Sequence, residues 1–399
     1  MSWVSGADGS PYGVTNLPYG VFRHAQGEPR VGVRVGDFVL DLAGAEEAGL
    51  VLAAGTLGRP TLNAFMALGR PQWTAVRQRV TELLTDADHR PAVEPLLVPL
   101  AEARMQLPFE VADYVDFYSS EHHASNVGQI FRPGQPPLLP NWKHLPIGYH
   151  GRAGTVVVSG TPVVRPSGQR ATPQGPVTGP SVRLDIEAEV GFVVGVPSPL
   201  GDRVPAGDFA DHVFGVVLVN DWSARDIQAW EYQPLGPFLG KSFATSVSAW
   251  VTPLDALGDA FVPAPEQDPP VADYLRDVPH LGLDLRLSVE WNGERVSEPP
   301  FATMYWTPAQ QLAHLTVNGA SLRTGDLYAS GTVSGPERSQ VGSFLELSWG
   351  GNEPVKFADG GTRTFLEDGD TVTITATAPG PDGTTIALGE VTGKVLAAR

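Results

Sequence analysis

The first hundred residues combine a two-residue alternation with a helical repeat. Val31–Val39 alternates apolar with other side chains around a Gly-Asp turn, which is typical of a β-hairpin. A helix is predicted after it, because Pro71 suits a first helical turn and apolar side chains then recur every three or four residues. These apolar positions are Trp73, Val76, Val80, Leu83 and Leu84. Pro91–Pro99 is predicted to be a linker.

From about residue 109 onward the pattern is mainly that of β-strands. Val182–Val190 alternates strictly between apolar and charged side chains. Phe214–Val219 is continuously apolar, as in a strand buried on both faces. Further strands are predicted at Leu283–Trp291, Phe344–Trp349, Thr371–Ala378 and Thr384–Leu388, the last two separated by a tight turn at Pro379–Gly383.

Few helices are predicted in this second part. One begins near Ser223, where Ser223 and Asp226 have the spacing of a capping box. Another runs from Thr307 to Gly319, and the proline-rich stretch Leu254–His280 is predicted to be a long loop. The sequence therefore predicts a mainly β (α+β) protein with a small β-containing N-terminal domain.

Length and composition narrow the class of protein. A chain of 399 residues is long for one compact core, which favours two domains or one large β domain with an attachment. A net charge of −17 disfavours binding to nucleic acid or to an anionic membrane. The absence of cysteine excludes disulfides, zinc–thiolate sites and thiol nucleophiles. Because the N-terminus lacks a signal-peptide pattern and the apolar runs are short, we expect a soluble, cytoplasmic protein.

The segment LDIEAE at residues 184–189 holds the first candidate for chemistry. Glu187 and Glu189 lie two residues apart on the alternating strand, so both side chains are expected to leave the same face. Such a pair usually belongs to a solvated strand face. Here the apolar run Val190–Val194 follows directly, which indicates a strand inside the sheet. Buried like charges need a proton or a cation, and a hard divalent ion with oxygen ligands is the natural cation here.

A second candidate follows the apolar run Phe214–Val219. A helix that starts there would place one carboxylate, one cation, one amide and one phenol on a single face. These residues are Asp221, Arg225, Gln228 and Tyr232. A solvated helix face gives the same pattern, but ligand sites favour strand-to-helix junctions, which favours a binding site.

Two further stretches contribute polar residues. Lys241 lies in GPFLGKSF, where the glycine spacing does not match a phosphate-binding P-loop, and its side chain is expected either at the surface or in a pocket. Asp113–Arg132 contains Asp116, Tyr118, His122, His123 and Arg132. Two adjacent histidines in a strand would point to opposite faces, so at most one would share a site with Asp116. The chain has none of the motifs of serine, zinc or cysteine hydrolases.

Six ordered motifs resemble one known family. They are DFYSSEHHASNVG, LLPNWKHLPIGYHGRA, LDIEAE, NDWSARDIQAWEYQPLGPFLGKSF, MYWTPAQQLAHLTVNG and ASGTVSG. Together with similarity that runs from NLPYGVF to GKVL near the C-terminus, they look like the fumarylacetoacetase family. The resemblance implies an SH3-like barrel over residues 1–108, a larger mixed β-roll catalytic domain over residues 109–399, and a homodimer.

The resemblance also implies roles for individual residues. The carboxylates that match metal ligands are Asp116, Glu187, Glu189 and Asp221, and the positions that match neighbours of the ion are Lys241 and Thr245. His123 matches the catalytic base and Glu346 the partner that orients it. The groups that match those holding substrate oxygens and the departing carbanion are Arg225, Gln228 and Lys241. The matched substrate-binding positions are Tyr118, Arg132, Tyr149, Gln228, Tyr232 and Thr332.

The implied activity is metal-dependent hydrolysis of the carbon–carbon bond of 4-fumarylacetoacetate to fumarate and acetoacetate, the last step of tyrosine and phenylalanine catabolism. The implied cofactors are Ca²⁺ and/or Mg²⁺, and the implied partner is a small β-diketo acid. Two alternatives stay open. One is a related acylpyruvate hydrolase or oxaloacetate decarboxylase with the same carboxylate site. The other is a non-catalytic metal-binding β protein, which has no need for His123, Glu346 and Lys241 together.

Overall fold

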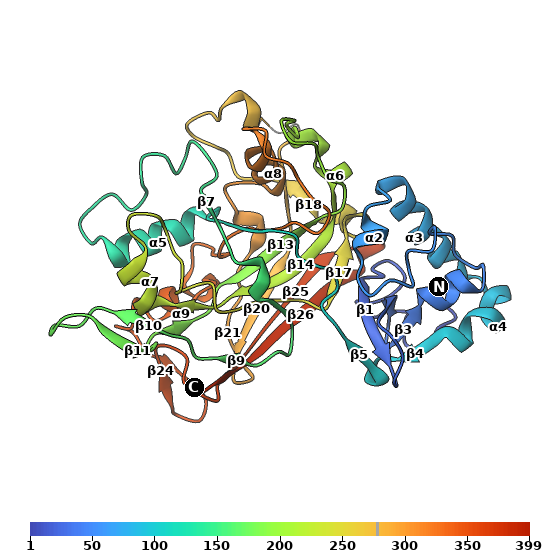
Figure 1. Cartoon of the computed structure of the whole chain (residues 1–399), viewed down its shortest axis with the longest axis horizontal. Coiled ribbons are helices and arrows are strands. Elements are labelled where there is room, and N and C mark those ends of the chain that lie inside the picture. The colour runs from blue at the N-terminus through green and yellow to red at the C-terminus, as the bar shows by residue number, and fades with distance from the viewer. Residues whose placement is uncertain (277–278) are drawn as a thin grey trace.

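The computed structural model describes residues 1–276 and 279–399, and most of its regular structure is β-strand (Figure 1). The predicted mainly β, mixed α+β class is confirmed. The strands of the larger sheet are β1 Tyr19–His24, β2 Arg30–Val35, β3 Phe38–Asp41, β4 Leu97–Pro99, β5 Ala103–Met105, β6 Tyr114–Phe117, β7 Gly148–His150, β8 Val156–Val158, β13 Ala188–Val194, β14 Val213–Asp221, β16 Thr245–Val247, β17 Trp250–Pro253 and β22 Leu327–Ala329. Their order is β4-β3-β2-β1-β17-β14-β13-β22-β6-β7, with β5 beside β1, and with β16 between β14 and β8.

A second sheet packs against the middle of the first. Its strands are β9 Val163–Val164, β20 Arg286–Trp291, β21 Glu294–Ser297, β25 Thr371–Pro379 and β26 Thr385–Leu396, in the order β21-β20-β25-β26-β9. The remaining strands form pairs: β10 Ser167–Arg170 with β11 Val177–Pro180, β12 Leu184–Asp185 with β15 Ser223–Ala224, β18 Phe261–Pro263 with β19 Leu281–Leu283, and β23 Val355–Lys356 with β24 Thr362–Arg363. The α-helices are α1 Leu42–Glu47, α2 Asn63–Met66, α3 Arg70–Thr85, α4 Arg90–Val93, α5 Glu121–Phe131, α6 Phe209–His212, α7 Arg225–Glu231, α8 Pro308–Thr316 and α9 Phe344–Leu347.

Strands β13 and β14 are buried on both faces, which explains their continuous apolar sequence. One face, with Phe192 and Leu218, belongs to the core shared with β20, β25 and β26. The opposite face, with Val193 and Val217, belongs to the core shared with the N-terminal strands and α3. The strand predicted at Phe214–Val219 is confirmed as part of β14, all nine residues of which are buried. The two hydrophobic cores therefore hold β13 and β14 in place, so the ends of these strands have fixed positions.

The N-terminal predictions are largely confirmed. β2 and β3 form the predicted hairpin, and α3 buries all five predicted apolar positions. These strands do not close into a separate barrel, because β1 also pairs with β17 and so continues the sheet of the second part (Figure 1). The predicted linker at Pro91–Pro99 is wrong. Its residues form the end of α4, a 3₁₀ turn and β4, with Pro91 and Pro95 in first helical turns, where proline is tolerated.

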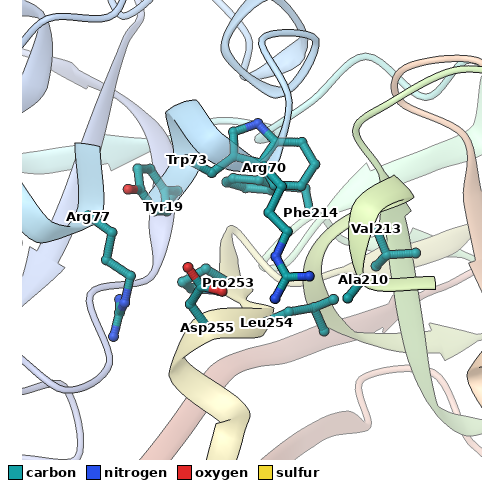
Figure 2. Close-up of a pocket in the computed structure, with 10 residues that line it drawn as sticks. All are labelled: Tyr19, Arg70, Trp73, Arg77, Ala210, Val213, Phe214, Pro253, Leu254 and Asp255. Atoms are coloured by element: carbon teal, nitrogen blue, oxygen red, sulfur yellow. The ribbon is translucent and has the colours of Figure 1, made fainter. Parts of the chain in front are cut away.

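The two parts of the chain meet around Phe214 of β14 (Figure 2). The rings of Tyr19 and Trp73 contact Phe214 edge-on, with centroids 5.4 and 5.1 Å away. Beside them, Arg77 of α3 is largely buried, and burial lowers the pKa of its guanidinium. The cavity enclosed here measures about 10 Å³, which is room for roughly one water molecule. We therefore assign this contact to packing and not to ligand binding.

Several details of the second part differ from the predictions. Phe344–Trp349 is not a strand, because its residues begin with α9, where the side chain of Ser343 caps the helix by accepting from the N–H of Glu346. Leu283–Trp291 is broken into the end of β19 and β20. Leu254–His280 contains 3₁₀ turns and β18, and its residues 277 and 278 lie outside the described part.

Other predictions in this part are confirmed. The helix from Thr307 is α8, with a capping box between Thr307 and Gln310. The strands on either side of the turn Pro379–Gly383 are β25 and β26, which pair as a long hairpin. None of the helices in the described residues has the length and hydropathy needed to cross a membrane.

Candidate active site

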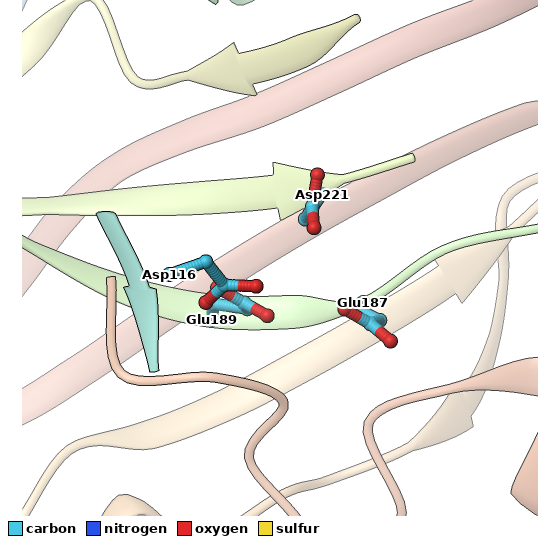
Figure 3. A group of neighbouring side chains, drawn as sticks. All are labelled: Asp116, Glu187, Glu189 and Asp221. Atoms are coloured by element: carbon cyan, nitrogen blue, oxygen red, sulfur yellow. The ribbon is translucent and has the colours of Figure 1, made fainter. Parts of the chain in front are cut away.

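Four acidic side chains from three segments of the chain meet near the ends of the central strands (Figure 3). β6 pairs with β22, β22 with β13, and β13 with β14, so these neighbours bring their acidic residues together. Asp116 lies on β6, Glu189 on β13, Asp221 at the end of β14 and Glu187 just before β13. All four are buried, and one oxygen of each lies within 4.8 Å of the others. The predicted meeting of these residues is confirmed.

The local geometry of Glu187 differs from the prediction. The alternating segment Val182–Val190 is not one strand: β12 ends at Asp185, β13 begins at Ala188, and Val182 is 60% exposed. Glu187 therefore lies in the break between two strands and not on the same strand face as Glu189. Both side chains still reach the cluster, because the N–H of Asp221 holds the break by donating to the carbonyl of Glu187 at 3.1 Å.

Part of this cluster lacks hydrogen-bond donors. Within the described residues, neither oxygen of Glu189 nor Oδ1 of Asp116 has a partner, and these atoms are buried. Burial, reinforced by neighbouring carboxylates, raises the pKa of Asp116 and of Glu189 well above their usual values. Buried carboxylate oxygens without donors need a proton or a cation. The oxygen-only donor set fits a hard divalent ion.

The pKa shifts predict how the pH affects the metal-free protein. The folded state holds protons on Asp116 and Glu189 that the unfolded state has already released above about pH 4.5, so stability should fall as the pH rises from there through the raised pKa values. A divalent ion binds the deprotonated carboxylates, so its stabilising effect should grow over the same range. Tm measured with chelator and with added ion across this range checks both trends. Glu189→Gln is the control and should flatten the slope; a wild-type metal effect that is constant with pH would contradict the prediction.

Two buried cations compensate the rest of the cluster. Lys241 donates through Nζ to Asp221 at 2.6 Å and also to Glu187. Arg225 donates through Nη1 to Glu187 at 2.7 Å and to Gln228 at 3.2 Å. Burial alone would raise the pKa of Glu187, but Lys241 and Arg225 outweigh it and hold the pKa below its usual range. The side chain of Lys241 was expected either at the surface or in a pocket. It lies in the pocket, since it is only 5% exposed.

A histidine–carboxylate pair lies beside the cluster. Nδ1 of His123 lies 2.7 Å from Oε2 of Glu346, and both side chains are buried. Glu346 also accepts from three other side chains, Asn126, Ser334 and Ser343, at 2.9, 3.0 and 2.7 Å. Burial would raise the pKa of Glu346, but His123 and the other donors lower it, so the carboxylate is charged and Nδ1 carries the proton. His123 is close enough to Glu187 to lower its pKa as well.

The histidines occupy a helix and not a strand. His122 and His123 lie in the first turn of α5, which Ser120 caps by accepting from the N–H of His123 at 3.2 Å. The prediction that only one histidine shares the site of Asp116 holds for this different reason: His123 is buried and lines the cavity, whereas His122 is partly exposed and does not.

A cavity of about 430 Å³ opens onto these groups. The predicted site residues that line it are Asp116, Tyr118, His123, Arg132, Tyr149, Glu187, Arg225, Gln228, Tyr232, Lys241 and Thr332. Four predicted residues, Glu189, Asp221, Thr245 and Glu346, lie behind this lining. Thr245 and Tyr149 donate to Asp221 at 3.2 and 2.8 Å, and the buried hydroxyl of Thr332 has no partner among the described residues.

The predicted start of the helix after β14 is wrong. α7 begins at Arg225, so Asp221 belongs to a strand, and the capping box of Ser223 and Asp226 does not form. Ser223 instead donates to the carbonyl of Asp221, and Asp226 accepts from Ser181. Arg225 and Gln228 still line one cavity with Tyr232, which is 40% exposed at its rim.

The sequence did not predict the residues that form hydrogen bonds with the site residues and so fix their positions. Asp185 accepts a hydrogen bond from Arg225. Glu346 accepts hydrogen bonds from Asn126, Ser334 and Ser343. Of these, only Asp185 had a signal in the sequence, because it is a third acidic residue in the alternating segment that contains Glu187 and Glu189.

Comparison with known proteins agrees with this arrangement. The family profile described as "Fumarylacetoacetate (FAA) hydrolase C-terminal" matches residues 113–395, and "Fumarylacetoacetase N-terminal" matches residues 15–108. The fumarylacetoacetase of Homo sapiens is 48% identical over 417 residues, covering 100% of this chain and 99% of the relative. The chain belongs to the fumarylacetoacetase family. The fumarylacetoacetase of Oryza sativa subsp. japonica is 45% identical over 420 residues, covering 100% of this chain and 97% of the relative.

Solved structures share the fold of this fumarylacetoacetase family member. Fumarylacetoacetate hydrolase from psychrophilic Exiguobacterium antarcticum has a TM-score of 0.57 at 16% identity, covering 96% of this chain and 99% of that one. Maleylpyruvate hydrolase from Sphingobium sp. SYK-6 has a TM-score of 0.52 at 18% identity, covering 96% of this chain and 100% of that one. Membership of the family makes the chain a hydrolase, and its buried acidic cluster is suited to a divalent metal ion.

Proposed function

We propose that this protein hydrolyses the carbon–carbon bond of 4-fumarylacetoacetate to fumarate and acetoacetate, the last step of tyrosine and phenylalanine catabolism. The observation that carries the proposal is the placement of the acidic cluster and the His123–Glu346 pair around one cavity, in a chain similar over its whole length to fumarylacetoacetases. The cavity of about 430 Å³ has the size of a small-molecule site.

The residues that would hold the metal are Asp116, Glu187, Glu189 and Asp221, with Lys241 and Thr245 beside them. We propose Ca²⁺ and/or Mg²⁺, because both prefer carboxylate oxygens. A bound divalent ion supplies Lewis acidity toward the carbonyl groups of the substrate. Four carboxylates exceed the charge of one such ion by two, and the buried cations Lys241 and Arg225 offset that excess.

His123 is the proposed general base. Glu346 fixes Nδ1 as the protonated nitrogen, which leaves Nε2 to take a proton from water. The hydroxide adds to the carbonyl carbon of the fumaryl group, and the bond from this carbon to the acetoacetate carbon then breaks, with its electron pair remaining on the acetoacetate carbon. That carbon takes up a proton, so one water molecule is divided between the two products. Water is thus the nucleophile, and no covalent enzyme intermediate forms.

The cations beside the cluster have a second proposed role. Arg225, Gln228 and Lys241 stabilise the oxyanion and the acetoacetate carbanion, because preorganised donors in a buried site stabilise developing charge strongly. Nη2 of Arg225 is buried without a partner among the described residues, so this donor is free for substrate. The proposed substrate-binding residues are Tyr118, Arg132, Tyr149, Gln228, Tyr232 and Thr332. Burial raises the pKa of Tyr118 and of Tyr149, so both keep their protons for hydrogen bonding.

Three further proposals concern the whole molecule. We propose that the chain divides into an N-terminal domain at 1–108 and a catalytic domain at 109–399, in support of which the two family profiles meet between residues 108 and 113. We also propose a homodimer, which the family resemblance supports, and a cytoplasmic location, with which a chain that contains no cysteine is compatible.

The activity is tested by the loss of diketone absorbance. We expect the purified protein to consume fumarylacetoacetate with a kcat/KM at least about tenfold above that for acylpyruvates, and not to decarboxylate oxaloacetate. Chelation should stop turnover and added Ca²⁺ or Mg²⁺ should restore it. Preferential turnover of an acylpyruvate would favour the related hydrolase, and metal binding without any turnover would favour the non-catalytic alternative.

A further inference from the structure

One buried carboxylate outside the matched site residues connects two parts of the site. Asp185 is fully buried and accepts four hydrogen bonds. Its Oδ1 accepts from the N–H groups of Ile186 and Phe344, both at 2.8 Å. Its Oδ2 accepts from Nε of Arg225 at 2.8 Å and from the N–H of Leu345 at 3.0 Å. Each oxygen has two donors, which fixes the orientation of the carboxylate.

The first part that Asp185 holds is the guanidinium of Arg225. Asp185 accepts from Nε, and Glu187 accepts from Nη1 at 2.7 Å, so two edges of the planar group are fixed. Nη2 has no partner in the part of the chain that the structure describes, and Arg225 lines the cavity. Asp185 therefore determines where this remaining donor points.

The second part is the short helix that carries Glu346. Phe344 and Leu345, whose N–H groups donate to Asp185, are the first two residues of α9 and directly precede Glu346. Glu346 in turn accepts from His123. A single side chain thus links the backbone beneath the histidine–carboxylate pair to the cation on the other side of the cavity.

We propose that Asp185 is a positioning residue that holds Arg225 and Glu346 in register, so that the proposed base and the proposed oxyanion donors meet the same substrate. The proposal rests on the proposed function. Its physical basis is that a buried carboxylate with four donors has one orientation, whereas Arg225 and the backbone of α9 have no other common partner among the described hydrogen bonds.

Asp185→Asn tests the proposal. The amide keeps the size of the side chain, but its NH₂ group meets two donors where a carboxylate oxygen stood. We expect kcat/KM for fumarylacetoacetate to fall about 10- to 100-fold, as the loss of a charged hydrogen bond predicts, with an unchanged metal content. The matched control is Asp370→Asn. Asp370 is also buried and accepts from Trp291, Asn292 and the N–H of Glu367, but it does not line the cavity.

A double-mutant cycle separates positioning from general stability. If Asp185 acts through Arg225 and Glu346, Asp185→Asn should cost clearly less in an Arg225→Gln or a Glu346→Gln background than in the wild type. Full additivity in both backgrounds, or a loss no greater than that of Asp370→Asn, would overturn the proposal. Asp185→Glu, which keeps the charge but displaces the carboxylate, replaces Asp185→Asn if that variant does not fold, and should lose activity in the same direction. If the wild-type protein does not act on fumarylacetoacetate, the proposed function itself is refuted. This outcome differs from the failure of the positioning proposal, in which the wild type is active but the variants show no coupling.

Discussion

Replacement of His123 by alanine is expected to remove most of the turnover and to leave the fold and the metal content unchanged. The imidazole is the proposed base, and general base catalysis by a positioned group contributes about 10²- to 10⁴-fold, so kcat should fall by about that factor. The hydrogen bonds that shape the site do not depend on the ring, because Glu346 keeps Asn126, Ser334 and Ser343 as donors. The measurement is kcat on fumarylacetoacetate, together with elemental analysis of the purified variant.

His122→Ala is the matched control for this variant. His122 lies in the same turn of α5 but is partly exposed and does not line the cavity, so its loss should change kcat by less than about twofold. If His123→Ala kept a turnover similar to that of His122→Ala, His123 would have no role as the base. A fall in kcat with a comparable loss of metal would instead show that His123 supports the carboxylate cluster.

The strands that carry the site could be predicted, because a strand that is buried on both faces has a continuous run of apolar residues. The apolar run before Asp221 predicts β14, and Glu189 precedes a second such run in β13. Acidic residues at such positions must be compensated, which was enough to predict a cation site. The meeting with Asp116 followed only from the resemblance, because its strand β6 has four residues and reaches the cluster through β22, far away in the sequence.

The strand predicted around Glu346, at Phe344–Trp349, is wrong, because the residue lies in the helix α9. FLELSW has aromatic and aliphatic residues that suit a strand, and the local pattern is too short to distinguish a helical turn. Tertiary contacts decide the structure there. Asp185 accepts from the first two N–H groups of α9, and the ring of Phe344 stacks on Trp291 with centroids 4.0 Å apart. None of these partners is near in sequence, so no local pattern contains the information.

The prediction that a helix begins near Ser223 was wrong for a similar reason. Ser223 has the spacing of a capping residue, but its backbone is engaged in β15, which pairs with β12 and places Ser223 opposite Asp185. Strand pairing with a distant segment therefore overrides the local capping signal. The residues missed altogether, such as Asn126 and Ser334, are single polar residues whose partner Glu346 is known only from the fold.

Asp221→Ala is expected to lose the metal ion, and with it the activity. Asp221 is one of the four clustered carboxylates, and even outer-shell changes cost about 10- to 100-fold in metal affinity, so loss of a direct ligand should cost at least about 100-fold. The metal content after dialysis should fall well below one ion per chain, as measured by elemental analysis. Asp370→Ala removes a buried carboxylate elsewhere in the same part of the chain and should keep its metal. An unchanged metal content in Asp221→Ala would contradict its assignment as a ligand.

Thermal unfolding distinguishes loss of the ion from loss of the fold in Asp221→Ala. Without Asp221, Lys241 loses one of its two carboxylate partners and keeps only Glu187, which destabilises the fold, whereas the repulsion among the remaining carboxylates decreases, which stabilises it. The two effects oppose each other, and the Tm of the variant should lie within a few degrees of that of the chelated wild type. Added Ca²⁺ or Mg²⁺ should raise the Tm of the wild type, because a ligand that binds only the folded state stabilises it, and should leave the Tm of the variant unchanged at the same concentration. A variant that gains as much from the ion as the wild type does would show that the other three carboxylates suffice.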